Sequence, residues 1–201
     1  MKGLPIDGHP DRDRLSAHLA DLCQQALPAG AQITRLAIRD MDFCTDLPHG
    51  HDRIPEWEPD RAAAFAALHA CDHLVLAFPL WWGAEPARLK GFWERIPLPG
   101  HAFRDHEEGP LRDRLLAGRS ADLLVTMNRP PLVLWLFCLD PLGRRYKRFV
   151  LLGFTGFSPI RLSCFGPVRR KKGAQRNLAR WQARTARLAG SAEKLKRKEK
   201  A

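Results

Sequence analysis

Several features that would assign a protein to a class at first reading are missing from this sequence. The longest apolar run covers residues 132–139, far short of the roughly 20 residues that a membrane span requires. The first residues, MKGLPIDGHPDRDR, lack the apolar core of a signal peptide. Both absences lead us to expect a cytoplasmic protein without a membrane span.

Cysteine and glycine motifs are equally scarce. The five cysteines lie far apart and include no C-x-x-C pair, so we expect neither a disulfide framework nor a zinc site, and we predict no metal site. The chain also lacks G-x-G-x-x-G and a lysine-containing phosphate loop. The usual fingerprints of dinucleotide and triphosphate binding are therefore absent.

Positive charge is what the sequence has in excess. The formal net charge of +11 is concentrated late in the chain, in segments 144–148, 169–172 and 194–200. A terminal run such as KLKRKEK usually forms a solvated helix end. We therefore divide the 201 residues into a domain, 1–190, and a basic tail, 191–201, and we do not expect nucleic acid as a partner. A nucleic-acid or anionic-membrane binder driven by charge remains an alternative.

Apolar runs and helix-forming segments alternate along the chain. Continuous or β-branched apolar runs predict strands at 3–6, 31–38, 73–80, 121–126 and 158–165. Helices are expected at 15–27, 61–70, 85–95, within 132–152 and at 174–195, with a long loop at 39–60. This alternation predicts an α/β three-layer sandwich around a doubly wound, five-stranded parallel sheet in the flavodoxin-like order 2-1-3-4-5. Pro5 is unfavourable in such a central first strand.

Ligands of such sheets bind beyond the carboxyl ends of the strands, where the strand order reverses. Three loops reach this edge: 7–16, 79–85 and 126–131. The first leads into a helix N-terminus, which favours a phosphate, and His9, Arg14 and Ser16 add hydrogen-bond donors. The alternative is an ordinary strand-to-helix turn that Asp13 or Ser16 caps.

The second loop contains two adjacent tryptophans, Trp81 and Trp82, directly after a buried strand. Because successive strand residues face opposite sides, at least one indole is expected at the sheet edge, where it can stack on an aromatic ring. Gly83 permits close backbone approach, and the N–H groups at 81–83 can reach acceptors of a bound heterocycle. Alternatively, the tryptophans cover a satellite core or a dimer contact.

The third loop, TMNRPP, adds the polar groups of Thr126, Asn128 and Arg129 at the same edge. Together, GHPD near the start, HLVLAFPLWWGAEPARLKGFWERIPLPGHAF at 73–103 and LLVTMNRPP resemble the flavodoxin-like NAD(P)H:quinone oxidoreductases. This is the family of DT-diaphorase and of the bacterial ancillary subunits of potassium-efflux systems. Its hallmark reads P-L-x-W, then P-A-x-L-K-G-[FW]-x-[DE]-R, then G-x-A-[FY]. The resemblance extends over most of the chain.

This resemblance implies FMN or FAD at the sheet edge, with NAD(P)H as co-substrate and a quinone or similar small-molecule electron acceptor. It also implies a homodimer. By position in the family motifs, the flavin-binding residues are His9, Arg14, Leu15, Ser16, Pro79, Leu80, Trp81, Trp82, Gly83, Thr126, Met127, Asn128 and Arg129. Arg14 stands where the family usually has serine, and its cation can still hold a phosphate.

The substrate side departs from the family. Segment 130–138 is apolar and contains neither the His nor the Tyr that the family often carries there. We assign no catalytic residue, because the flavin itself carries the hydride. The predicted enzyme is a NAD(P)H dehydrogenase (quinone)-like flavoenzyme. The alternative is a flavodoxin-like regulatory protein with weak or no redox activity, which binds a membrane transporter or another partner through Trp135 and the basic segments.

Overall fold

A computed structural model describes residues 1–48, 50, 56–106, 112–169 and 171–198. Parts of the predicted loop 39–60 and of the predicted tail 191–201 lie outside these residues, as does Arg170 of the basic segment 169–172. Within the described chain, a six-stranded parallel sheet contains β1 (Lys2–Asp7), β2 (Gln32–Ile33), β3 (Leu36–Ala37), β4 (His73–Pro79), β7 (Ser120–Thr126) and β8 (Ile160–Phe165). The order is β2-β1-β4-β7-β8, and β3 also pairs with β1. Because β2 and β3 together occupy the place of the second predicted strand, the predicted order is confirmed.

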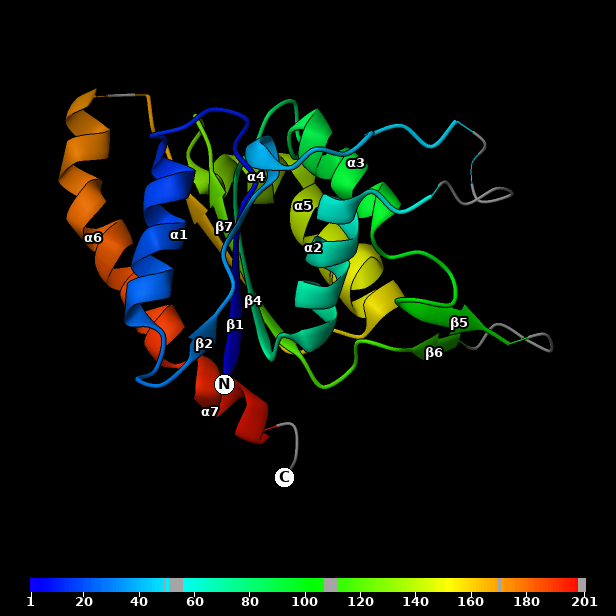
Figure 1. Ribbon diagram of the computed structural model, residues 1–201. Helices are drawn as coiled ribbons and strands as arrows, with labels where there is room; N and C mark the ends of the chain where they lie inside the picture. The colour runs from blue at the N-terminus through cyan, green and yellow to red at the C-terminus, as the bar shows by residue number, and fades with distance from the viewer. Residues whose placement is uncertain (49, 51–55, 107–111, 170, 199–201) are drawn as a thin grey trace.

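Helices cover both faces of the sheet (Figure 1). Helices α1 (Leu15–Ala26) and α6 (Lys171–Gly190) pack against each other on one face. Helices α2 (Pro59–Ala70) and α3 (Ala87–Arg95) lie on the other. This is the predicted three-layer arrangement of a flavodoxin-like fold.

Strand β4 shows why its sequence is apolar without alternation. Its side chains are all buried, and successive residues enter different cores. Leu74, Leu76 and Phe78 pack with α2 and α3, whereas Val75 and Ala77 pack with α1. A strand covered on both faces favours a near-continuous run of apolar residues, so the run at 73–80 identifies the centre of the sheet.

Pro5 accounts for the break between β2 and β3. The Thr34 N–H donates to the Gly3 carbonyl at 3.0 Å. Alternate residues of a parallel strand bond the same neighbour, so Pro5 is the next residue of β1 that faces this strand, and it has no N–H to donate. The ladder therefore stops after Ile33 and resumes at Leu36.

Several elements differ from the predictions. In place of one helix within 132–152, the chain forms α4 (Pro131–Cys138), α5 (Pro141–Arg144) and a π-helix, η2 (Arg145–Thr155). The hairpin of β5 (Phe103–Asp105) and β6 (Arg112–Arg114) is absent from the predicted elements, because its charged strands show no apolar alternation. A short 3-10 helix, η1 (Ile38–Asp40), opens the predicted loop.

The last described helix lies on the amino-terminal side of the sheet (Figure 1). The predicted basic tail begins as helix α7 (Ala192–Lys198), whose first residue, Ala192, is buried against the core. Among the described residues, no helix combines the length and the apolar character needed to cross a membrane.

A polar cluster is buried at this same amino-terminal edge. His73 and Asp122 are fully buried, with His73 Nε2 3.3 Å from Asp122 Oδ2, and His73 Nδ1 lies 2.8 Å from Ser120 Oγ. Arg161 of β8 donates to both carboxylate oxygens of Asp122 at 2.5 Å. The set has the composition of a hydrolase triad, but its enclosure leaves no room for a substrate. It therefore ties β4, β7 and β8 together as a structural network.

Candidate functional site

A cleft of about 480 Å³ opens at the carboxyl edge of the sheet, where the strand order reverses. Loops that follow β1, β4, β7 and β8 form its walls. Its lining residues are His9, Pro10, Asp11, Arg14, Leu15, Ser16, Pro79, Leu80, Trp81, Thr126, Met127, Asn128, Val168 and Arg169. The structure thus brings ten of the thirteen sequence-predicted flavin residues to one cleft. Trp82, Gly83 and Arg129 are not among the lining residues.

The N-terminus of α1 faces this cleft without a side-chain cap. Arg14 is the N-cap residue, and no side chain accepts a hydrogen bond from the first turn. The first turn contains no acidic residue, and the buried Ser16 hydroxyl lies 3.3 Å from Thr126 Oγ1. The alternative of a turn capped by Asp13 or Ser16 is therefore wrong. Uncapped N–H groups at the positive end of a helix are suited to an anion.

His9 presents a hydrogen-bond donor to the same region. Its Nδ1 accepts the backbone N–H of Asp11 at 2.9 Å, and burial lowers the pKa of the imidazole below its ordinary value. A neutral ring whose Nδ1 is an acceptor carries its proton on Nε2. The Nε2–H group is thus the one left to donate to a ligand.

The charge of Arg14 is partly used within the protein. Its guanidinium forms an ion pair with Asp11, and Arg14 Nε donates to Asp11 Oδ2 at 2.6 Å. This hydrogen bond holds the pKa of the Asp11 carboxyl below its ordinary value. Because Asp11 also lines the cleft, it reduces the attraction that Arg14 exerts on an anion.

The two tryptophans form a tight turn at the edge of the cleft. Trp81 and Ala84 exchange backbone hydrogen bonds of 2.8 and 2.9 Å, and the two residues between them, Trp82 and Gly83, have positive φ angles of 50° and 82°. The Trp81 N–H is therefore not available to a ligand, whereas those of Trp82 and Gly83 donate to no described residue.

The two indoles differ in their surroundings. Trp81 lines the cleft, is 44% exposed, and packs edge-on against His9 with ring centroids 5.5 Å apart. Trp82 is fully exposed. The expectation of an aromatic side chain at the sheet edge is confirmed, and the residue that borders the cleft is Trp81.

The opposite wall is built from strand ends held in register. Leu80 N donates to the Thr126 carbonyl at 2.8 Å, and Val168 N donates to the Met127 carbonyl at 3.0 Å. The second of these bonds brings the loop after β8, with Val168 and Arg169, to the cleft. Sequence reasoning misses Val168 and Arg169, because no local pattern marks a loop that reaches the site by tertiary pairing. Pro10 and Asp11 belong to the predicted loop 7–16 but are not among the predicted flavin residues.

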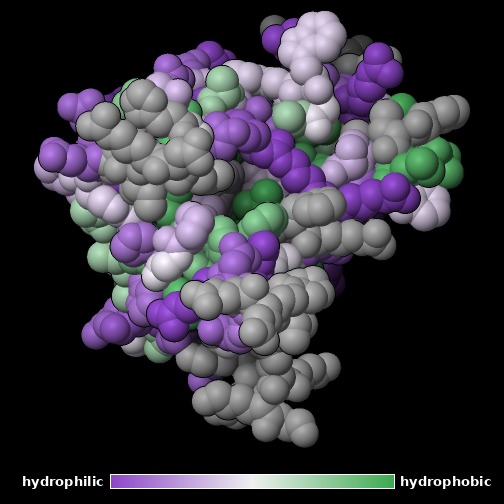
Figure 2. Space-filling view, turned by 90° about the vertical axis from the view of Figure 1, so that its right-hand side faces the viewer, coloured by the Kyte–Doolittle hydropathy of each residue, from purple (hydrophilic) through white to green (hydrophobic). Residues whose placement is uncertain are grey.

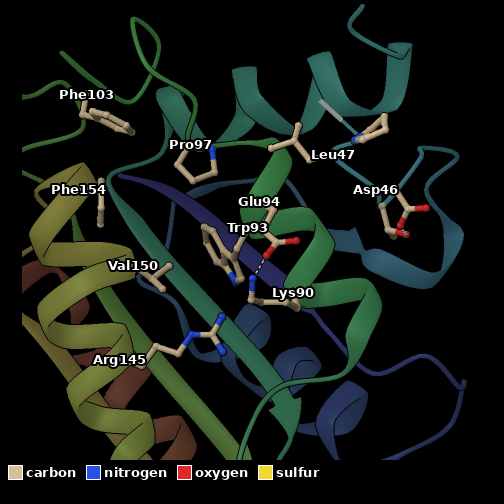
Figure 3. Close-up of a pocket in the computed structure, with 12 residues that line it drawn as sticks. Asp46, Leu47, Lys90, Trp93, Glu94, Pro97, Phe103, Arg145, Val150 and Phe154 are labelled. Carbon is tan, nitrogen blue, oxygen red and sulfur yellow. Dashed lines mark hydrogen bonds and ion pairs between the residues drawn. The ribbon is translucent and has the colours of Figure 1, made fainter. Parts of the chain in front are cut away.

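A larger cavity of about 830 Å³ lies between α3, η2 and segment 45–48. Figure 2 shows a hollow on this face with hydrophobic surface at its floor, and Figure 3 shows the side chains around it. Its two cations are paired within the protein, Lys90 with Glu94 and Arg145 with Glu85. No sequence-predicted site residue lines it. We therefore place the candidate site in the smaller cleft, which offers free donors at the strand-order reversal.

Comparison with known proteins agrees with this geometry. A family described by its flavodoxin-like fold matches residues 1–185. The chain belongs to this family. Its strand order and the position of the cleft are those expected for such a fold.

Two curated relatives carry oxidoreductase names. An "Uncharacterized NAD(P)H oxidoreductase YcaK" of Escherichia coli K12 is 33% identical over 108 residues, which cover 51% of this chain and 55% of that protein. The "NAD(P)H dehydrogenase [quinone] 1" of Rattus norvegicus is 36% identical over 59 residues, which cover 28% of this chain and 22% of that protein. The matches thus span about half of one relative and less than a quarter of the other.

Solved structures extend the likeness over nearly the whole chain. Smu.1420 from Streptococcus mutans UA159 superposes with a TM-score of 0.77 at 22% identity, covering 93% of this chain and 100% of that one. An NAD(P)H:quinone oxidoreductase from Methanothermobacter marburgensis gives 0.75 at 19% identity, covering 95% of each chain. At these identities the likeness establishes the fold.

Proposed function

We propose that this protein is a flavin-dependent NAD(P)H oxidoreductase that reduces a quinone or a related small acceptor. The observation that carries the proposal is the cleft at the strand-order reversal, where an uncapped helix N-terminus lies beside the partly exposed Trp81. A phosphate-binding group and an aromatic wall are what a phosphorylated flavin needs. The names of the two curated relatives favour the same chemistry.

The described residues fit the two parts of such a cofactor. We assign its phosphate to the start of α1, to the Ser16 hydroxyl and to His9 Nε2, all of which are donors. We assign its ring system to Trp81 and to segment 126–128, with the N–H groups of Trp82 and Gly83 as donors to ring acceptors. When bound, the flavin supplies the hydride chemistry, and the protein binds and orients it and shields it from water.

FMN is the form of flavin that we propose. Among the described residues, the cleft contains a single helix N-terminus, that of α1, which matches a cofactor with one phosphate. The homodimer and the cytoplasmic location stay predictions, and NADH and NADPH are both kept as candidate co-substrates. The acceptor is proposed to be apolar, because α4, which follows the wall of the cleft, consists of apolar residues.

Flavin loading followed by reduction tests the proposal. We expect the purified full chain to retain FMN, to bleach its visible absorbance under NADH or NADPH without oxygen, and to recover the absorbance on addition of a benzoquinone. Riboflavin, which lacks the phosphate, should bind more weakly than FMN. Uptake of FMN without bleaching would favour the regulatory alternative, and a protein that takes up neither FMN nor FAD would refute the proposal.

A further inference from the structure

The excess positive charge of the protein belongs to a single segment. Residues 166–198 contain twelve basic residues and one acidic residue, Glu193. The rest of the chain contains 21 basic and 21 acidic residues, so this segment accounts for the whole formal net charge of +11. It forms the loop after β8 and the helices α6 and α7. The excess charge is therefore gathered on two neighbouring helices rather than spread over the surface.

Helix α6 carries its charge on the side away from its packing face. Trp181, Thr185 and Ala189 are buried, and the helix packs against α1. At 3.6 residues per turn and 1.5 Å per residue, four exposed arginines fall within about 80° of the helix circumference and extend over about 16 Å. These four, called the arginine stripe below, are Arg176, Arg180, Arg184 and Arg187. They follow the side of the molecule that α6 occupies (Figure 1).

The arginine stripe has no counter-charge within the protein. Among the residues that the structure describes, no ion pair and no side-chain hydrogen bond includes any of its four guanidinium groups. By contrast, the exposed Arg12 and Arg14 each pair with an aspartate. None of the four arginines lines the flavin cleft. Their charges are thus available to an anion outside the chain, and guanidinium groups are well suited to phosphate.

The surface between these arginines consists of small residues. Ala179, Ala183 and Gly190 are exposed, and none of the exposed large hydrophobic side chains of the described chain lies on α6 or α7. A stable protein interface needs an apolar centre, and a helix that lies on a bilayer inserts an apolar face. The apolar face of α6 is already buried within the chain. The stripe therefore suits a partner whose affinity comes from charge alone.

We propose that the arginine stripe binds the phosphate backbone of duplex DNA without regard to base sequence. Contacts with phosphates supply almost all of the affinity in binding of this kind. Single strands are instead held by stacking on exposed aromatic side chains, and the one aromatic residue of α6, Trp181, is buried. The small residues beside the arginines let α6 approach the major groove of B-DNA, which admits a helix, whereas the corresponding groove of RNA is deep and narrow.

This binding surface is distinct from the terminal basic run. The expectation of no nucleic-acid partner treats the run at 194–200 as a solvated helix end, and the arginine stripe lies before that run, within α6. A charge-driven nucleic-acid binder, the alternative that the net charge leaves open, is also compatible with flavin binding, because the stripe and the cleft share no residue.

Fluorescence anisotropy of a labelled DNA duplex of about 20 base pairs, titrated with the purified full chain, tests the inference. Four phosphate contacts predict a slope of about −3.6 for the logarithm of the binding constant against the logarithm of salt concentration, which is about a 150-fold loss between about 50 and about 200 mM salt. Flavin-free and FMN-loaded protein should bind alike. Failure of this inference therefore leaves the proposed flavin chemistry untouched, and the reverse also holds.

Matched charge variants locate the contact. Arg180→Gln with Arg184→Gln removes two of the four contacts and should reduce the salt slope by about 1.8, which leaves about a 12-fold loss over the same salt range. Arg144→Gln with Lys147→Gln makes the same change of charge at exposed residues outside α6 and should leave the slope of the original chain unchanged. Glutamine is as good a helix former as arginine, and melting temperatures check that each variant is folded.

Three results would overturn the inference. One is the absence of duplex binding by the original chain at about 50 mM salt. Another is an equal change of slope in the two variant pairs, which would indicate an effect of net charge alone. The third is tighter binding to phosphatidylglycerol vesicles or to polyglutamate than to DNA at the same salt concentration, since the partner would then be a bilayer or an acidic protein.

Discussion

Trp81 is the residue whose substitution most directly tests the proposed flavin site. A buried tryptophan removes roughly 150–250 Å² from solvent, and Trp81 is 44% exposed. A ring laid against it would cover up to about 90 Å², which is worth about 2 kcal/mol at about 25 cal/mol per Å². We therefore expect Trp81→Ala to raise the Kd for FMN about 30-fold.

Titration of flavin fluorescence at equilibrium measures this change. Trp135→Ala is the matched control, because Trp135 is an exposed tryptophan outside the cleft lining, and it should shift the Kd less than about twofold. Trp81→Phe should recover most of the affinity, because it retains an aromatic face. If Trp81→Ala and Trp135→Ala bind FMN equally well, the assignment of the ring to Trp81 is wrong.

Three further substitutions test the phosphate site, the tryptophan turn and the loop that carries Asp46 beside the larger cavity. Ser16→Ala should weaken FMN binding by about 1 kcal/mol and leave riboflavin binding unchanged in the same titration, because riboflavin has no phosphate; equal losses for both would contradict the assignment. Trp82→Gly should stabilise the fold by about 1 kcal/mol and raise the Tm by about 2–4 °C in a calorimetric scan, since glycine tolerates the positive φ at no loss of packing. Arg95→Met should lower the free energy of unfolding, measured with a chemical denaturant, by about 3 kcal/mol. The reason is that the buried Arg95 donates hydrogen bonds to the Cys44 and Asp46 carbonyls and to the Glu58 carboxylate. An unchanged unfolding midpoint would show that these bonds add no net stability.

The centre of the fold is predictable from the sequence because burial on both faces leaves a continuous apolar run. Strand β4 has such a run, and its neighbours along the chain alternate with helix-forming segments. The break between β2 and β3 is a tertiary effect, since the missing donor is Pro5 of another strand. The η2 helix is beyond sequence reasoning for a different reason: π-helical turns are rare and have no distinctive residue pattern.

The candidate site is predictable to the extent that its loops follow the strands. Ten predicted residues line the cleft because the carboxyl ends of parallel strands must meet at one edge. Which tryptophan borders the cleft depends on the positive φ at Trp82, a conformation that propensity argues against for a bulky residue. Val168 and Arg169 reach the cleft through pairing with Met127, and that pairing is decided by the fold as a whole.

The buried network at the amino-terminal edge makes the stability of the fold depend on pH in the acid range. Burial by itself raises the pKa of Asp122, but the contacts with His73 and Arg161 outweigh it and hold the pKa below its ordinary value. A carboxyl whose pKa is lower in the folded state than in the unfolded state stabilises the fold. This stabilisation is complete above the unfolded-state pKa of about 3.9 and is lost as the pH falls through the folded-state pKa. The stability of the chain should therefore fall below about pH 4.

Asp122→Asn separates this network from the other carboxyls. The substitution keeps the shape of the side chain but leaves the Arg161 guanidinium without its charged partner. It should therefore lower the free energy of unfolding by about 3 kcal/mol near neutral pH. Asp105→Asn breaks the exposed pair with Arg112 and should cost less than about 1 kcal/mol. Urea unfolding midpoints measured between neutral pH and acid should show a weaker acid dependence in Asp122→Asn than in Asp105→Asn. If the stability of the two variants falls alike with falling pH, Asp122 is not the carboxyl responsible for the acid dependence of stability.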